Sequence, residues 1–209
     1  LTALTFPFYL YTRPVGGQAF SLPETLTLLC AAAWFARVLA RRQPRWSGAH
    51  LPPVLFFVAV AVLSLAATAD LRLSLRELRT VVIEPALFYV MAAAAFGQPG
   101  RLPRAALAWA LVLAGAAAAS QSLAQYFVTN EAIGAEGVVR AVGPYGSPNN
   151  LGLLLERALP LAVAGVLLTR RDARRVTLAA AFMLVIGVAL FLTYSVGAWV
   201  GGVVGMVVF

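Results

Sequence analysis

Residues Arg140–Arg157 read R-A-V-G-P-Y-G-S-P-N-N-L-G-L-L-L-E-R, a turn-rich segment that runs directly into an apolar, charge-bearing helix. The glycines on either side of Pro144 can adopt positive φ, so they predict a tight turn. Ser147 and Pro148 then fit the N-cap and the first position of a helix. This stretch therefore predicts a loop that ends at a helix N-terminus.

The rest of the chain consists largely of apolar segments. Its 209 residues are 61% hydrophobic and only 11% charged, and the mean hydropathy is +0.86. A soluble domain has about 25% charged residues, whereas apolar runs of about 17–25 residues, long enough to span a bilayer, recur here. We therefore expect an all-α, polytopic transmembrane helical bundle of about seven to eight membrane segments. Residues 1–209 would form a single integral membrane domain, truncated at both ends because Leu1 and Phe209 lie inside apolar runs.

The net charge of +8 comes from arginines. They lie mostly in short loops between apolar runs, where positive residues set membrane topology, so we do not expect a nucleic-acid partner. The side of the membrane whose loops contain more arginines is predicted to be cytoplasmic. This places an amphipathic helix near 70–80 and a loop near 128–147 on the outer side. The predicted cytoplasmic arginines are Arg41, Arg42, Arg45, Arg101, Arg104, Arg170, Arg171, Arg174 and Arg175, and the outer ones are Arg13, Arg72, Arg76, Arg79 and Arg140.

Residues 70–80 read D-L-R-L-S-L-R-E-L-R-T, with a leucine stripe beside an arginine stripe. One hypothesis is an interfacial helix resting on anionic lipid. The other is a clamp on a diphosphate, formed by Arg72, Arg76 and Arg79. Pro85 follows Glu84 in the next apolar segment, where we expect a kink that opens room beside the carboxylate.

The helix that begins at Pro148 is the main candidate site. Asn149 and Asn150 fall in its first turn, beside free backbone N–H groups that favour an anion, and Arg140 lies just upstream. Arg157 lies about 13 Å deeper along the helix. It would either line a polar cavity or form a structural pair with Glu84 or another acid. The predicted substrate-binding residues are Arg140, Tyr145, Ser147, Asn149, Asn150, Arg157, Arg76 and Arg79.

Other chemistry-bearing patterns are absent from the sequence. There is no P-loop, no nucleophile elbow and no Cys or His ligand spacing, and the lone Cys30 and His50 cannot form a metal cluster. We therefore expect neither a metal nor a cofactor. Gly197, Gly201 and Gly205 are spaced four residues apart and predict close helix packing.

Three segments carry a resemblance to a known family. R-A-V-G-P-Y-G-S-P-N-N-L at 140–151, L-T-Y-S-V-G-A-W-V-G at 192–201 and L-R-E-L-R-T-V-V-I-E-P at 75–85 resemble the O-antigen ligase and O-antigen polymerase family of bacterial membrane glycosyltransferases. The resemblance covers the chain from about Asp70 onward. Val196 occupies the position where the family pattern has an arginine.

The resemblance implies a metal-independent glycosyltransferase of the bacterial inner membrane, with site loops facing the periplasm or cell exterior. The donor would be a polyprenyl-diphosphate-linked glycan, and the acceptor would be lipid A–core in lipopolysaccharide biosynthesis, a growing polysaccharide or a protein. Arg140, Asn149, Arg76 and Arg79 match the arginine-rich donor site by position. The catalytic histidine is expected in a periplasmic loop beyond Phe209, so the catalytic residue is unknown.

Two alternatives remain open at this stage. A membrane transporter or exporter of a lipid-linked or anionic substrate could use the same outward-facing cavity, and would be built from inverted repeats with broken helices. A catalytically inactive member that only binds a glycan-linked lipid or a partner would explain Val196.

Overall fold

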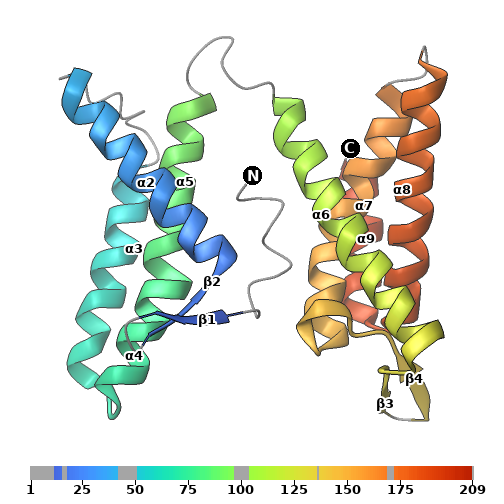
Figure 1. Cartoon of the computed structure of the whole chain (residues 1–209), viewed down its shortest axis with the longest axis horizontal. Coiled ribbons are helices and arrows are strands. Elements are labelled where there is room, and N and C mark those ends of the chain that lie inside the picture. The colour runs from blue at the N-terminus through green and yellow to red at the C-terminus, as the bar shows by residue number, and fades with distance from the viewer. Residues whose placement is uncertain are drawn as a thin grey trace. The chain divides into compact units, whose positions relative to one another are not determined.

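The computed structural model describes residues 12–15, 18–41, 51–96, 104–135, 137–168 and 172–208. Its contacts divide the chain into two compact units, one of residues Arg13–Arg104 and one mainly of residues Ala105–Phe209. Figure 1 shows the elements of both. Outside the described residues lie five of the arginines assigned to the cytoplasmic side, namely Arg42, Arg45, Arg101, Arg170 and Arg171.

The N-terminal unit consists of a two-stranded sheet and a group of helices. Strands β1 (Thr12–Val15) and β2 (Gln18–Ser21) pair with each other, and a Gly-Gly sequence between two short strands favours such a pairing. The helices are α2 (Leu22–Arg41), α3 (Leu51–Ser64), the 3-10 turn η3 (Leu65–Ala67), α4 (Leu71–Glu77), the π-helical turn η4 (Leu78–Ile83) and α5 (Glu84–Phe96).

The amphipathic helix predicted near 70–80 forms, but it does not end at Thr80. Asp70 caps α4 by accepting a hydrogen bond from the Leu73 N–H at 3.0 Å. The backbone then continues without a break through η4 into α5, and the Glu84 N–H donates to the Arg79 carbonyl, five residues back. The open space expected beside Glu84 is not seen, because this residue is 7% exposed.

The C-terminal unit is a helical bundle with one small hairpin. Its helices are α6 (Arg104–Ala124), the π-helical turn η5 (Gln125–Thr129), the 3-10 turn η6 (Gly143–Tyr145), α7 (Pro148–Leu168), α8 (Ala173–Leu192) and α9 (Val196–Val208). Strands β3 (Ile133–Ala135) and β4 (Val138–Arg140) pair antiparallel, with Ile133 opposite Arg140. The predicted loop at 128–147 therefore contains a hairpin, with Gly137 at positive φ (79°) between its strands.

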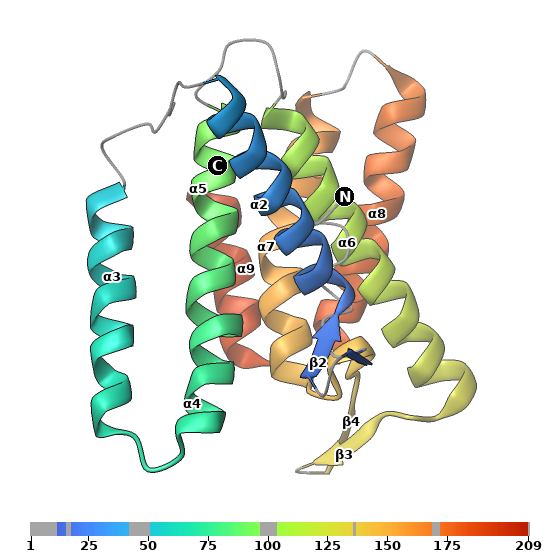
Figure 2. The same cartoon turned by 60° about the vertical axis from the view of Figure 1, so that its left-hand side comes forward.

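Small side chains allow the helices of this unit to approach closely. More than half of its buried core residues are alanines, interleaved with Leu151, Leu155 and Ile186. The side-by-side arrangement of α7, α8 and α9 is visible in Figures 1 and 2. Since an alanine core leaves little volume between backbones, packing here depends on backbone proximity rather than on large interlocking side chains.

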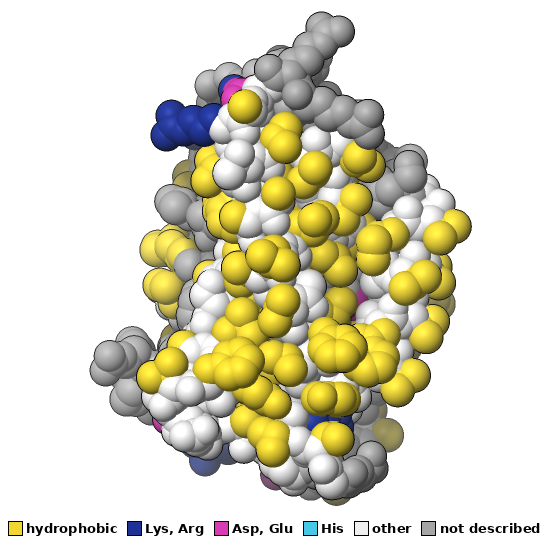
Figure 3. Space-filling model, turned by 90° about the vertical axis from the view of Figure 1, so that its right-hand side faces the viewer, with side chains coloured by type: hydrophobic (Ala, Val, Ile, Leu, Met, Phe, Trp, Pro, Cys, Tyr) yellow, Lys and Arg dark blue, Asp and Glu magenta, His cyan; other side chains and the backbone are white. Residues whose placement is uncertain are grey.

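Four helical segments are long and apolar enough to cross a membrane, namely Leu22–Ala40, Ala105–Thr129, Pro148–Leu168 and Ala173–Leu192. Two apolar helical segments, Leu51–Ala67 and Val196–Val208, are shorter. The all-α membrane class is therefore supported, whereas the predicted count of seven to eight segments is not confirmed. No residue of α3 is buried. Hydrophobic side chains cover much of the face shown in Figure 3. Both features are expected for surfaces in contact with lipid.

The glycine ridge of α9 packs against α7 at two of its three predicted positions. A Cβ added at Gly205 would lie 3.0 Å from Pro160 Cγ, and one added at Gly201 would lie 2.9 Å from Glu156 Cδ. A Cβ at Gly197 would meet no described atom within 4 Å. The packing prediction is therefore confirmed for Gly201 and Gly205.

This difference makes a testable contrast along one helix. Gly205→Leu is expected to destabilise the bundle by about 1–3 kcal/mol, because the larger side chain is forced against Pro160. Gly197→Leu is the matched control and should leave stability nearly unchanged. Unfolding of the detergent-solubilised protein by titration with SDS measures both, and equal effects of the two variants would contradict the packing assignment.

Candidate functional site

Arg140, the last residue of β4, joins three segments of the C-terminal unit. Its Nε donates to the Thr193 carbonyl at 2.8 Å, and its Nη2 donates to the Tyr194 carbonyl at 3.3 Å. The same Nη2 donates to Asn149 Oδ1 at 3.0 Å. Thr193 and Tyr194 form the turn between α8 and α9, and Asn149 lies in the first turn of α7. The structure therefore brings Arg140 and Asn149 together, as the sequence predicted for neighbouring site residues.

The segment between Arg140 and α7 forms the predicted tight turn. Gly143, the first residue of the 3-10 turn η6, and Gly146, which directly follows this turn, both have φ of 59°. Helix α7 begins at Pro148, and the Ser147 carbonyl accepts its first helical hydrogen bond from the Leu151 N–H at 3.1 Å. Glycine adopts positive φ at little cost, so these two glycines allow the turn that brings the N-terminus of α7 beside Arg140.

Close packing also holds this turn against α6 and α7. A Cβ added at Gly143 would lie 3.2 Å from Leu151 Cδ1 and 3.3 Å from Ser122 Cβ. On the hairpin side, the Ala141 N–H donates to the Leu192 carbonyl at 2.9 Å. The position of Arg140 is therefore fixed by backbone contacts on both sides.

Arg140 brings a positive charge to this end of the bundle. Carbonyls at the C-terminal end of α8 carry partial negative charge and attract the guanidinium, and the first turn of α7 presents N–H groups. No carboxylate in the described part of the chain forms an ion pair with Arg140. Ser147 and Tyr145 are half-buried, and Asn149 and Asn150 are exposed. This combination can hold an anion.

Aromatic residues gather next to the same turn. The Phe191 and Trp199 rings stack with centroids 5.5 Å apart and an interplanar angle of 5°. Tyr194 lies 6.2 Å from Trp199, whose Nε1 donates to the Leu190 carbonyl at 3.1 Å. This cluster was not singled out from the sequence, although three aromatic residues at 191–199 were a visible signal.

Arg157 lies further along α7 and is exposed. No ion pair joins it to an acid among the residues that the structure describes. Its neighbour Glu156 instead packs against Gly201 of α9. Glu84, the partner considered from the sequence, lies 3.7 Å from Arg79. A role of Arg157 in substrate binding stays a prediction.

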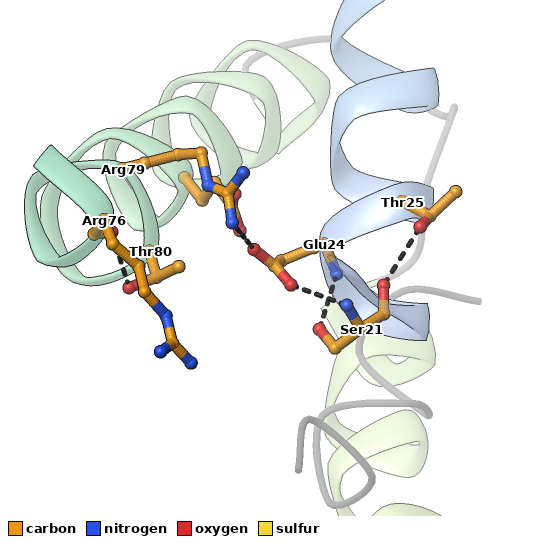
Figure 4. A network of polar contacts seen from close by, with 7 residues as sticks. Ser21, Glu24, Thr25, Arg76, Arg79 and Thr80 are labelled. Atoms are coloured by element: carbon orange, nitrogen blue, oxygen red, sulfur yellow. Dashed lines mark hydrogen bonds and ion pairs between the residues drawn. The ribbon is translucent and has the colours of Figure 1, made fainter. Parts of the chain in front are cut away.

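A second polar cluster occurs in the N-terminal unit, at the start of α2 (Figure 4). The Ser21 N–H donates to Glu24 Oε2 at 2.6 Å, and the Glu24 N–H donates to Ser21 Oγ at 3.3 Å. This reciprocal pattern is a capping box. The sequence S-L-P-E at 21–24 signals it, and Glu24 was nevertheless missed as a candidate because its partner is distant in the chain.

That partner is Arg79, which the sequence placed in a substrate clamp. Arg79 Nη2 donates to Glu24 Oε1 at 2.9 Å, Nε lies 3.7 Å from Glu84 Oε1, and Cζ lies 4.6 Å from the centre of the Phe20 ring. Arg76 remains exposed three residues earlier. Since Arg79 is held between two acidic side chains, the arginine stripe does not act as one uniform positive face.

The π-helical turn explains how Arg79 and Glu84 come close together. In an α-helix, residues five positions apart point in different directions, whereas a π-turn has an i→i+5 hydrogen bond and brings them close to one face. Arg79 and Glu84 are five positions apart and span this turn. The leucine and arginine spacing assumes a regular helix, so it could not reveal this pairing.

The candidate residues fall into two units whose placement relative to each other is not defined. Arg140, Tyr145, Ser147, Asn149, Asn150 and Arg157 belong to the C-terminal unit, and Arg76 and Arg79 to the N-terminal unit. Their joint action on one ligand stays a prediction. Within the described residues, no group of three or more His, Cys, Asp or Glu side chains is arranged to hold a metal ion.

Comparisons with known proteins add no further identification. No protein-family model matches the sequence, and searches of curated proteins and of solved structures found no match.

Proposed function

We propose that this chain is part of a bacterial inner-membrane glycosyltransferase that transfers a polyprenyl-diphosphate-linked glycan to lipid A–core, a growing glycan or a protein. The observation that carries the proposal is the position of Arg140 beside the first turn of α7, with no acidic partner among the described residues. The resemblance of the segments at 140–151 and 192–201 to the O-antigen ligase and polymerase family supplies the substrate class.

Arg140 would bind the diphosphate of the donor. Its contacts with the Thr193 and Tyr194 carbonyls fix the guanidinium before the ligand arrives, which reduces the ordering cost of binding. Charge-assisted hydrogen bonds to phosphate and the N–H groups of α7 would then act on the same anion. Asn149, held by Arg140, would present its amide to the ligand. The cluster thus holds and orients the donor, and the acceptor is activated elsewhere.

The membrane arrangement follows from the same proposal. The four long apolar helices would cross the inner membrane together with the two shorter apolar helices, which accounts for six of the predicted seven to eight segments. In the C-terminal unit, Arg140 contacts the end of α8, whereas Asp172 and Arg175 lie at its start. Twenty residues of helix separate these ends by about 30 Å, so Arg140 and the basic turn near 170–175 would face opposite sides of the bilayer.

Arg140→Ala in the full-length protein tests the proposal. Loss of a charge-assisted contact of about 1.5–3 kcal/mol should lower glycan transfer from the lipid-linked donor by roughly tenfold or more, without loss of membrane insertion. Arg140→Lys keeps the charge but cannot reach both carbonyls and Asn149, so it should retain more activity than the alanine variant.

Arg175→Ala is the matched control, since it removes an exposed arginine of an ion pair at the other end of α8 and should leave transfer unchanged. The melting temperature of each purified variant separates a binding defect from unfolding. Full transfer activity of a folded Arg140→Ala protein would exclude Arg140 from donor binding.

A further inference from the structure

We propose that Glu84 binds a proton in the N-terminal unit, within a buried cluster that it forms with Glu24 and Arg79. This site is separate from the donor-binding residues of the C-terminal unit and does not depend on the proposed function. Its ligand is a proton taken up where α2 packs against α5.

Geometry places both carboxyl groups against one guanidinium. Arg79 Nη2 donates to Glu24 at 2.9 Å, whereas Arg79 Nε lies 3.7 Å from Glu84, beyond hydrogen-bonding distance. Glu24 also accepts from the Ser21 N–H at 2.6 Å, as Figure 4 shows. Glu24 is therefore well satisfied as a carboxylate, and Glu84 is not.

Burial makes two carboxylates at this place unfavourable. Glu24 and Glu84 are 8% and 7% exposed, respectively. A buried charge costs several kcal/mol unless it is paired and hydrogen-bonded. One arginine can balance one of the two charges, so a second carboxylate would be left uncompensated. A proton on Glu84 removes that charge.

The surroundings of Glu84 agree with a neutral acid. Its Oε1 is fully buried and has no hydrogen-bond partner, which a carboxylate oxygen tolerates poorly. When protonated, the Glu84 carboxyl group carries no charge and can itself donate a hydrogen bond.

No other described charge compensates the pair. Helix α3 and strand β2, which belong to the same unit, contain no ionisable residue. The remaining charged residues of α4, Arg72, Arg76 and Glu77, are exposed and form no ion pair within the described part of the chain. The local charge of Glu24, Arg79 and Glu84 is thus balanced when one proton is bound.

Infrared difference spectroscopy with hydrogen–deuterium exchange detects such a proton directly in the full-length protein in lipid nanodiscs. Near neutral pH, the wild-type protein should show the carbonyl stretch of a protonated carboxylic acid, and Glu84→Gln should lack it. Glu24→Gln should lack it as well, because Glu84 then ionises beside Arg79 as the only acid. Glu77→Gln, which alters an exposed acid on the same helix, is the control and should retain the band.

Two results would overturn the proposal. A band that persists in Glu84→Gln, or that is missing from the wild type, would show that Glu84 does not carry the proton. A band that persists in Glu24→Gln would show that burial alone protonates Glu84 and that Glu24 plays no part in the proton site. Glutamine has nearly the shape of protonated glutamate, so the melting temperature of Glu84→Gln should stay unchanged and confirm that this variant folds.

Discussion

Arg79→Ala is expected to destabilise the N-terminal unit by about 3 kcal/mol, because removal of one partner of a buried ion pair leaves the other charge uncompensated. The Arg79 side chain is 26% exposed, and the Glu24 side chain is 10% exposed. The substitution also removes the stacking of the guanidinium on the Phe20 ring. Thermal unfolding of the detergent-solubilised protein, followed by circular dichroism, measures the loss.

Second-site variants identify the source of this effect. In the Arg79→Ala background, Glu24→Gln should restore part of the stability, since it removes the carboxylate that lost its partner. Glu84→Gln should restore little, because a protonated Glu84 carries no charge to begin with. Arg72→Ala, an exposed arginine on the same helix, is the control and should change stability by less than about 0.5 kcal/mol. An equal loss in Arg72→Ala would contradict a specific role for the Arg79 ion pairs.

Gly115→Ala is expected to have the second-largest effect on stability. A Cβ at Gly115 of α6 would lie 2.6 Å from the Cβ of Ala158 in α7, and both atoms are attached directly to helix backbones. The helices must therefore separate, at a cost of about 1–3 kcal/mol that exceeds the gain in helix propensity of up to about 1 kcal/mol. Unfolding by titration with SDS would show the loss as a shift to lower detergent fraction.

Ala158→Gly provides a compensating change for this contact. Alone it should destabilise α7 slightly, because glycine is a poorer helix former than alanine. Combined with Gly115→Ala it should restore most of the lost stability, since the two methyl groups exchange places across the same contact. Additive losses in the double variant would show that the two residues are not in contact, because independent sites behave additively.

The arrangement around Arg140 was largely predictable from local sequence. Two glycines around Pro144, followed by Ser147 and Pro148, allow few alternatives to a turn that enters a helix. The observed φ of 59° at both glycines confirms this prediction. The contacts of Arg140 with Thr193 and Tyr194 could not be predicted, because these carbonyls lie more than 50 residues away and become available only where α8 ends.

The role of the arginine stripe, by contrast, was not predictable from the local sequence. Spacing alone assigned Arg72, Arg76 and Arg79 to one positive helix face, because the pattern assumes a constant 3.6 residues per turn. The π-helical turn between Arg79 and Glu84 departs from this spacing and brings these two residues close together. Arg79 also pairs with Glu24, 55 residues earlier in the chain, and is therefore not equivalent to Arg76.

The sequence by itself determined the helical membrane class, the tight turn before α7 and the contacts of Gly201 and Gly205 in α9, because each depends on composition or on spacing along one element. Tertiary structure alone decided which charges are paired. Glu24, Arg79 and Glu84 come together because α2 packs beside the junction of η4 and α5. Such long-range contacts depend on how helices pack, and local hydrophobic and polar patterns do not specify them.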